Sequence, residues 1–174
     1  MSSDAEKPTS METVLKLRES LCSEDTPLPI RFRALFSLKH VAVTQTNPED
    51  VKVAAIEAIA AGFTSPSALL KHELAYCLGQ TCNTAAVKPL REVLADLKED
   101  PMCRHEAAEA LGALGWADNL DILREYRDRK EEDISIVETC EIAIERIEWE
   151  NSEERQKEKL RPRFVKSILR LPSH

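Results

Sequence analysis

The chain has 174 residues, of which 43% are hydrophobic and 32% are charged, with only 4 glycines and 5% aromatic residues. This length supports one domain with a real core and leaves no room for a second large domain, and the composition favours an Ala/Leu/Glu-rich helical protein. The formal net charge of -7 argues against a general nucleic-acid binder, because phosphate contacts need an excess of Lys and Arg; an acidic protein better suits a basic partner.

The sequence carries no visible targeting or membrane signal. The first ten residues, MSSDAEKPTS, lack an apolar stretch, and no run of about 18 apolar residues occurs along the chain. The five cysteines are an odd number without paired C-x-x-C spacing, which predicts neither a disulfide framework nor a zinc ribbon. We therefore expect a protein of the reducing cytoplasm.

The N-terminal part predicts three helices. Residues 1–26 are expected to hold an N-terminal segment and the first helix. The segment RFRALFSLKH, at 31–40, follows two prolines and predicts a second helix, and a third runs from about 48 to 61. The second and third helices resemble a looser copy of the repeat that follows, at a larger offset, and are interpreted as a terminal repeat.

A repeat with a period of 33 residues organises the middle of the chain. The segments LLKHELAYCLGQ (69–80) and CRHEAAEALGAL (103–114) align without gaps when His72 is laid on His105, since 105 − 72 = 33. Within them, apolar residues recur at i, i+4 and i+8, which predicts one buried stripe per helix. Good N-cap residues precede each copy at the same interval: Ser67, Asp100 and Asp133.

Partner helices are predicted between these copies, at 86–97 and 119–129, so that the repeating unit is a helical hairpin. Stacked hairpins of this length indicate an all-α fold, an α-solenoid of about four HEAT-like repeats over residues 27–149. Residues 150–174 are charged and lack the repeat, and we interpret them as a solvated tail, disordered or partly helical. The alternative is a short amphipathic segment around 164–169 that docks on a partner or on the last repeat.

Two copies carry the same dipeptide at the same register, His72-Glu73 and His105-Glu106. Equivalent helices of successive repeats lie roughly 8–10 Å apart, so these side chains should become neighbours in space. Two imidazoles and one or two carboxylates can close on a metal ion, and two histidines with one carboxylate are the ligands typical of non-haem iron that activates dioxygen. Taken alone, each motif would ordinarily hold a histidine that is exposed to solvent or has its hydrogen bonds satisfied within the protein. The register that the two motifs share favours a metal site.

Nearby residues offer weaker alternatives. The zinc-protease pattern H-E-x-x-H is absent, since Tyr76 and Glu109 stand where its second histidine would be. Cys103 points about 200° away from His105 on a helix and is expected in the core. Glu109 lies one turn after His105 and is either a hydrogen-bond partner of that ring or an ordinary surface residue.

The remaining histidines and the other repeat copies are not expected to bind metal. His40 ends an early helix and His174 is the last residue, so both are predicted to face solvent. The dipeptides at the equivalent register of the third and the earliest copy, Glu138-Thr139 and Phe32-Arg33, both lack histidine. The predicted ligand set therefore stops at two repeats.

The segments SALLKHELAYCLGQ and PMCRHEAAEALGALG closely resemble deoxyhypusine hydroxylase, as do RFRALFSL before them and VETCEIAIERIEW after them. The resemblance covers about residue 29 to Trp149. It implies a HEAT-like solenoid of two similar halves, each contributing two His-Glu motifs to a di-iron centre. It further implies that His72, His105 and Glu106 ligate iron, and that Glu73 is either a further ligand or a residue that binds the substrate's cationic amine.

The resemblance also implies the activity, which is O2-dependent hydroxylation of the deoxyhypusine side chain of eukaryotic initiation factor 5A, a step of hypusine biosynthesis. Such an oxidoreductase is an iron-binding monooxygenase with a protein substrate, and neither nucleic acid nor a membrane is expected as a partner. The long cationic side chain would be attracted to a carboxylate-rich face of an acidic protein.

This chain departs from the family pattern in showing two His-Glu motifs where four are needed. Three alternatives follow: a homodimer that completes the di-iron site, binding of one iron without hydroxylation, and a truncated form without activity. Outside this activity, the sequence leaves open a metal-free HEAT-repeat interaction module and a relative of the HEAT-like chromophore lyases.

Overall fold

The structure is a computed structural model and describes residues 8–160, in which every regular element is helical. The helices are α1 (Met11–Cys22), α2 (Leu28–Val43), α3 (Glu49–Ala61), α4 (Ala68–Gly79), α5 (Val87–Ala95), α6 (Pro101–Leu114), α7 (Leu120–Arg127), α8 (Ile134–Glu150) and α9 (Glu153–Leu160). In this range no helix has the length and apolar content needed to cross a bilayer.

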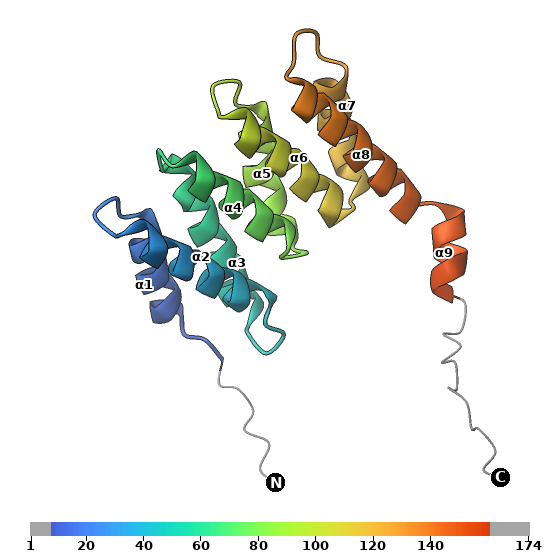
Figure 1. The fold of residues 1–174 in the computed structure, drawn as a ribbon. Helices are drawn as coiled ribbons and strands as arrows, with labels where there is room; N and C mark the ends of the chain where they lie inside the picture. The colour runs from blue at the N-terminus through green and yellow to red at the C-terminus, as the bar shows by residue number, and fades with distance from the viewer. Residues whose placement is uncertain (1–7, 161–174) are drawn as a thin grey trace, which may run out of the picture.

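The helices stack in chain order (Figure 1): α1, α2 and α3 pack on one another, α5 forms a hairpin with α6, and α7 forms a hairpin with α8. Helices α4, α6 and α8 form one layer, in which α6 packs against α4 on one side and α8 on the other. The structure confirms the predicted α-solenoid of about four repeats. The two predicted partner helices begin within one residue of α5 and α7 and extend two residues beyond their ends, and short 3₁₀ turns at Thr84–Ala86 and Ala117–Asn119 precede them.

The three predicted N-caps begin helices α4, α6 and α8. The hydroxyl of Ser67 accepts a hydrogen bond from the backbone N–H of Leu70, at 3.2 Å. The carboxylates of Asp100 and Asp133 each accept one from the backbone N–H two residues later, at 2.9 Å. These bonds satisfy N–H groups that the helix itself leaves unpaired, and they fix where each copy of the repeat begins.

The predicted apolar stripes form one continuous core. Every member of the stripes of α4 and α6 is fully buried: Leu70, Leu74, Leu78, Cys103, Ala107 and Leu111. The partner helices add Leu90 and Leu123, which are also fully buried and again lie 33 residues apart. Burial of this apolar surface is the main favourable contribution to the stability of such a stack.

Two glycines allow the helices of the core layer to approach closely. A Cβ placed on Gly79 would lie 2.8 Å from the Cβ and 3.0 Å from the Cα of Ala110, and one placed on Gly112 would lie 2.7 and 2.9 Å from the same atoms of Ala143. The two glycines are 33 residues apart in sequence, and so are the two alanines. The α4–α6 and α6–α8 interfaces therefore share one spacing.

The ends of the repeat domain differ from its middle. Phe32 of α2 occupies the register of His72 at an offset of 72 − 32 = 40 residues, larger than the 33 of the later copies. At the C-terminal end, α9 covers the first part of the predicted tail. The amphipathic segment considered for residues 164–169 lies outside the described residues.

Candidate metal centre

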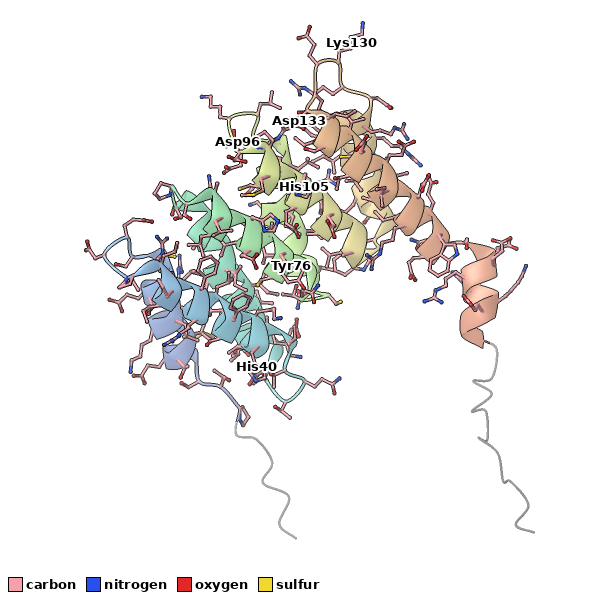
Figure 2. All side chains as sticks on the ribbon, in the orientation of Figure 1. His40, Tyr76, Asp96, His105, Lys130 and Asp133 are labelled. Carbon is pink, nitrogen blue, oxygen red and sulfur yellow. The ribbon has the colours of Figure 1, made fainter. Side chains whose placement is uncertain are left out.

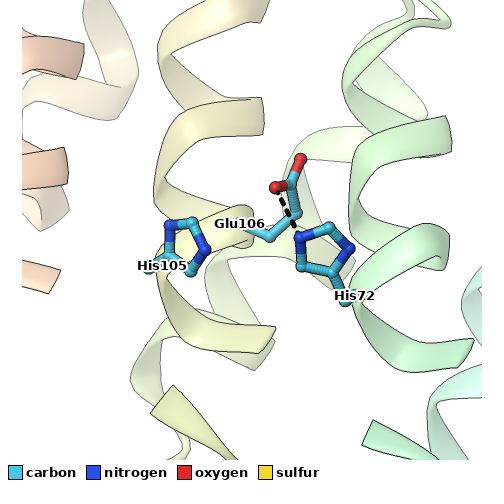
Figure 3. A group of neighbouring side chains, drawn as sticks. All are labelled: His72, His105 and Glu106. Carbon is cyan, nitrogen blue, oxygen red and sulfur yellow. Dashed lines mark ion pairs between the residues drawn. The ribbon is translucent and has the colours of Figure 1, made fainter. Parts of the chain in front are cut away.

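Helices α4 and α6 place two imidazole rings and one carboxylate together (Figure 3). The ring centroids of His72 and His105 are 6.0 Å apart. One ligand atom from each of His72, His105 and Glu106 can be chosen so that all three lie within 4.8 Å of one another. The repeat register thus makes neighbours of residues that are 33 positions apart in sequence, as the sequence analysis predicted.

Glu106 is the most buried member of this group. Its side chain is only 7% exposed, and one carboxylate oxygen lies 3.1 Å from Nε2 of His72. Burial raises the pKa of Glu106, the imidazole of His72 opposes that shift, and the carboxylates of Glu109 and Glu73 add to it. A cation bound here would relieve this accumulation of negative charge.

Glu73 lies beside the group and outside it. Its carboxylate is 3.4 Å from Nδ1 of His72, which is within ion-pair distance, but the geometry makes no hydrogen bond, and Nδ1 is a buried nitrogen without a hydrogen-bond partner. Glu73 is 28% exposed, so it faces the surface more than Glu106 does. The two glutamates, equivalent by register, therefore have different surroundings.

The three residues fit a divalent transition metal. Two ligands bound at about 2.1 Å on opposite sides of an ion are about 4.2 Å apart, so the group needs only a small contraction to close. The donors are imidazole nitrogens and a carboxylate oxygen, the set that iron accepts, and Nε2 of His72 is the nitrogen that faces the Glu106 carboxylate. Three protein ligands leave further coordination positions open.

The other candidates from the sequence do not join this group. Glu109 is exposed. Cys103 is buried with its thiol 3.3 Å from the backbone oxygen of Ala68, and burial raises its pKa to about 12, so it is a core residue. His40 is exposed near the edge of the stack, away from His105 (Figure 2), and His174 lies outside the described residues.

The third copy holds no comparable group. In α8, Glu138 is exposed, and the hydroxyl of Thr139 donates a hydrogen bond to the backbone oxygen of Ser135 at 2.7 Å. A cleft of about 270 Å³ lies between α6 and α8, lined in part by Glu109, Thr139 and Arg146. None of His72, His105 and Glu106 lines this cleft, which Glu109 borders one turn after His105.

Sequence reasoning missed a set of ion pairs that flank the two histidines. Lys71 immediately precedes His72 and pairs with Glu99, and Arg104 immediately precedes His105 and pairs with Glu132. The signal was available, because both partners recur at the interval of 33. It was obscured because one cation is a lysine and the other an arginine.

Comparison with known protein families supports the fold assignment. A family model described as HEAT repeats matches residues 56–138. The chain is 80% identical over 172 residues to the deoxyhypusine hydroxylase of Gibberella zeae, and this match covers 97% of the chain and 51% of that protein. It is 70% identical over 156 residues to the deoxyhypusine hydroxylase of Neurospora crassa, covering 90% of the chain and 48% of that protein.

A solved structure agrees with these matches. Human deoxyhypusine hydroxylase, in a complex with glycerol, superposes with a TM-score of 0.72 and 40% sequence identity, covering 87% of this chain and 47% of the human chain. The chain thus spans about half the length of the relatives it matches.

Proposed function

Because the chain belongs to the deoxyhypusine hydroxylase family over the half of its relatives' length that it spans, we propose that it carries half of the metal centre of an iron-dependent monooxygenase. The reaction would be hydroxylation of the deoxyhypusine side chain of eukaryotic initiation factor 5A by O2, in the cytoplasm. The observation that supports this proposal most directly is the convergence of His72, His105 and Glu106 within 4.8 Å.

The metal would be held by these three side chains. Iron bound there supplies the activation of dioxygen and the oxidation of a C–H bond. The chain's own part is to present two imidazole nitrogens and the Glu106 carboxylate as ligands and to leave coordination positions open. The raised pKa of Glu106 means that metal binding should release a proton as the pH approaches the pKa of that carboxyl.

Glu73 has a second role in this proposal. The substrate side chain carries cationic amines on a long flexible stem, and a carboxylate that is partly exposed beside the metal can accept hydrogen bonds from an ammonium group. Glu109 on the neighbouring helix adds negative charge to the same face. Glu73 would therefore bind the substrate's amine and place one C–H bond near the metal.

A complete di-iron centre would need ligands beyond those in this chain. The sequence has two His-Glu motifs, and a second copy of the chain would supply two more. A homodimer that joins the two faces would then rebuild a four-motif site. An inactive interaction module, the alternative kept in the sequence analysis, would need none of these ligands.

The test is iron stoichiometry measured together with oligomeric state. We expect two irons per dimer for the wild-type chain, loss of iron in His105→Ala, and unchanged iron in His40→Ala, the matched control outside the group. An iron-free monomer whose stability and metal binding are insensitive to His105→Ala would contradict the metal-site proposal. The inactive interaction module would then be the remaining alternative.

The role of Glu73 is tested separately by Glu73→Gln. We expect this variant to weaken binding of the deoxyhypusine-containing substrate more than binding of iron, because the neutral amide cannot form an ion pair with an ammonium group. Glu109→Gln serves as the control for a general loss of negative charge on this face. Equal loss of substrate and iron binding in Glu73→Gln would reject the division of roles.

A further inference from the structure

One carboxylate connects the residue before His72 to the helix that carries His105. The ammonium of Lys71, on α4, donates hydrogen bonds to both carboxylate oxygens of Glu99, at 2.5 and 2.7 Å. One of those oxygens also accepts a hydrogen bond from the backbone N–H of Asp100, the N-cap of α6, at 2.7 Å. The Lys71 and Glu99 side chains are only 14% and 11% exposed, which strengthens the pairing relative to a surface ion pair.

The α4–α6 interface has a second fixed point two helical turns away. There Gly79 meets Ala110, with no room for a Cβ between the helices. His72 lies between these two points and directly follows Lys71. Any sliding or rocking of α4 about the glycine contact would therefore move His72 relative to His105, unless the Lys71–Glu99 pair prevents it.

We propose that Lys71 and Glu99 are positioning residues for the metal group, which hold α4 against the first turn of α6 and so set the separation of His72 and His105. The proposal rests on the metal site proposed above for its metal-binding consequences. Ligand atoms must be held within about 0.5 Å of their productive positions, and packed helices can shift by about 1–2 Å in switching proteins.

The same device occurs one repeat later and supplies an internal control. The guanidinium of Arg104 pairs with both oxygens of Glu132 at 2.8 Å, both side chains are 5% exposed, and Glu132 accepts a hydrogen bond from the backbone N–H of Asp133, the N-cap of α8. This pair joins α6 to α8, and α8 contributes no member of the three-residue group. Its loss should destabilise the stack without separating His72 from His105.

The experiment compares Glu99→Gln with Glu132→Gln in the full chain, with Co²⁺ as the metal probe. We expect Glu99→Gln to weaken Co²⁺ binding on the order of 10-fold, the effect of removing a partner that orients metal ligands. Glu132→Gln should change it by no more than about twofold, because the Arg104–Glu132 pair holds α6 to the start of α8 and does not join α4 to α6. Lys71→Arg, which keeps the cation, should retain most of the affinity.

A second measurement needs no metal. Proton–proton Overhauser contacts between the rings of His72 and His105 in the metal-free chain should persist in Glu132→Gln and weaken in Glu99→Gln. Equal effects of the two glutamate variants on Co²⁺ affinity, or intact ring contacts in Glu99→Gln, would overturn the positioning role. If the wild-type chain binds no Co²⁺, the proposed function fails, and the ring contacts alone still decide the role of Lys71 and Glu99.

Discussion

The α4–α6 and α6–α8 interfaces have the same construction and different chemistry. Each has a largely buried cation, Lys71 or Arg104, paired with a glutamate that precedes an N-cap aspartate, and each has a glycine packed on an alanine at the other end. Only the first interface places imidazoles on both helices. The comparison indicates that the repeat sets the distance between neighbouring helices. The two residues at the His-Glu register of each helix then decide whether an interface can bind metal.

The residues at the equivalent register of α8 explain why the second interface has no metal group. Glu138 is exposed, and the hydroxyl of Thr139 is engaged with its own helix. The cleft beside them is lined by Glu109, Arg146 and Ile142, among others, so the space between α6 and α8 is open and of mixed polarity. The backbone spacing, by contrast, is as close as at the first interface.

The largest effect is expected from moving the metal site by one repeat. His72→Ala should abolish Co²⁺ binding, because it removes one of only three ligands. Adding Glu138→His and Thr139→Glu to that variant should restore binding, since these side chains would meet His105 across the α6–α8 interface at the same spacing. Co²⁺ titration followed by visible absorbance measures both steps.

The control for this transfer is the triple variant His72→Ala, Glu138→His and Thr139→Glu with His105→Ala added as a fourth substitution. It should bind no Co²⁺, because the transferred site needs His105. If the triple variant with His105 intact remains unable to bind Co²⁺, then the two interfaces differ in more than the chemistry of these residues.

The next largest effect is expected on stability, from Glu132→Gln. This change leaves the buried guanidinium of Arg104 without its anionic partner, which should lower the free energy of unfolding by about 3 kcal/mol. Glu99→Gln should cost less, because Lys71 is more exposed and its flexible stem can reach water. Urea unfolding of the two variants at neutral pH measures the difference, and an equal loss would contradict it.

The dependence of stability on pH tests the Arg104–Glu132 pair independently. Hydrogen bonds from Arg104 hold the pKa of Glu132 below its ordinary value, so the folded state favours the ionised carboxylate. The stability that results is complete above the ordinary carboxyl range and is lost as the pH falls through the lower, folded-state pKa. Glu132→Gln should therefore flatten the fall of stability below about pH 4.3, the ordinary glutamate pKa.

A smaller effect is expected from adding one methyl group at each glycine contact. Gly79→Ala and Gly112→Ala should each lower the free energy of unfolding by about 1–2 kcal/mol, because overpacking outweighs the better helix propensity of alanine. Only Gly79→Ala should also weaken Co²⁺ binding, since only that contact separates α4 from α6. Thermal unfolding and Co²⁺ titration of both variants test this difference.

Gly115→Ala provides a matched control for the glycine pair. Gly115 ends α6 with a φ of +76°, and a Cβ there would meet no atom within 4 Å. The substitution should cost about 1–2 kcal/mol through backbone strain alone and leave the interfaces in place. Weakened Co²⁺ binding in Gly115→Ala would mean that loss of stability by itself disturbs the metal group.

The sequence predicted the features that repeat in every copy. The period of 33 located the N-caps, the buried stripes and the meeting of His72 with His105, because one register determines which helical face a residue occupies. It could not separate Glu73 from Glu106, which are equivalent by register. Their burial differs because α6 is packed closely on both sides, by α4 and by α8, whereas the Glu73-bearing helix is packed closely only by α6.

Features that depend on contacts between copies were beyond the sequence analysis. The pairing of Lys71 with Glu99 spans 28 residues, and the sequence analysis assigned no role to Glu99. The recurrence of Gly79 at Gly112 was visible, but a glycine inside a helix has several explanations until its neighbour is known. The predicted partner helices begin within one residue of α5 and α7, but the 3₁₀ turns before them were not predicted.

The smallest effect is expected from Asp121→Asn, which tests whether any ion pair between repeats can position the metal group. Arg91 of α5 and Asp121 of α7 form a bidentate pair at 2.8 Å between the same two hairpins as Arg104 and Glu132. This pair lies in the other helix layer, with side chains that are 31% and 67% exposed. Hydrogen bonds from Arg91 lower the pKa of Asp121 to about 2. Its contribution should therefore persist to lower pH than that of an ordinary aspartate and then disappear.

Solvent screening limits the contribution of this pair to at most about 1 kcal/mol, and added salt should reduce it further. Co²⁺ binding should not change in Asp121→Asn, because neither α5 nor α7 carries a residue of the metal group. Urea unfolding at two salt concentrations and a Co²⁺ titration measure both quantities. A loss of Co²⁺ affinity as large as that in Glu99→Gln would mean that general cohesion of the stack, and not the local contact between α4 and α6, sets the distance between His72 and His105.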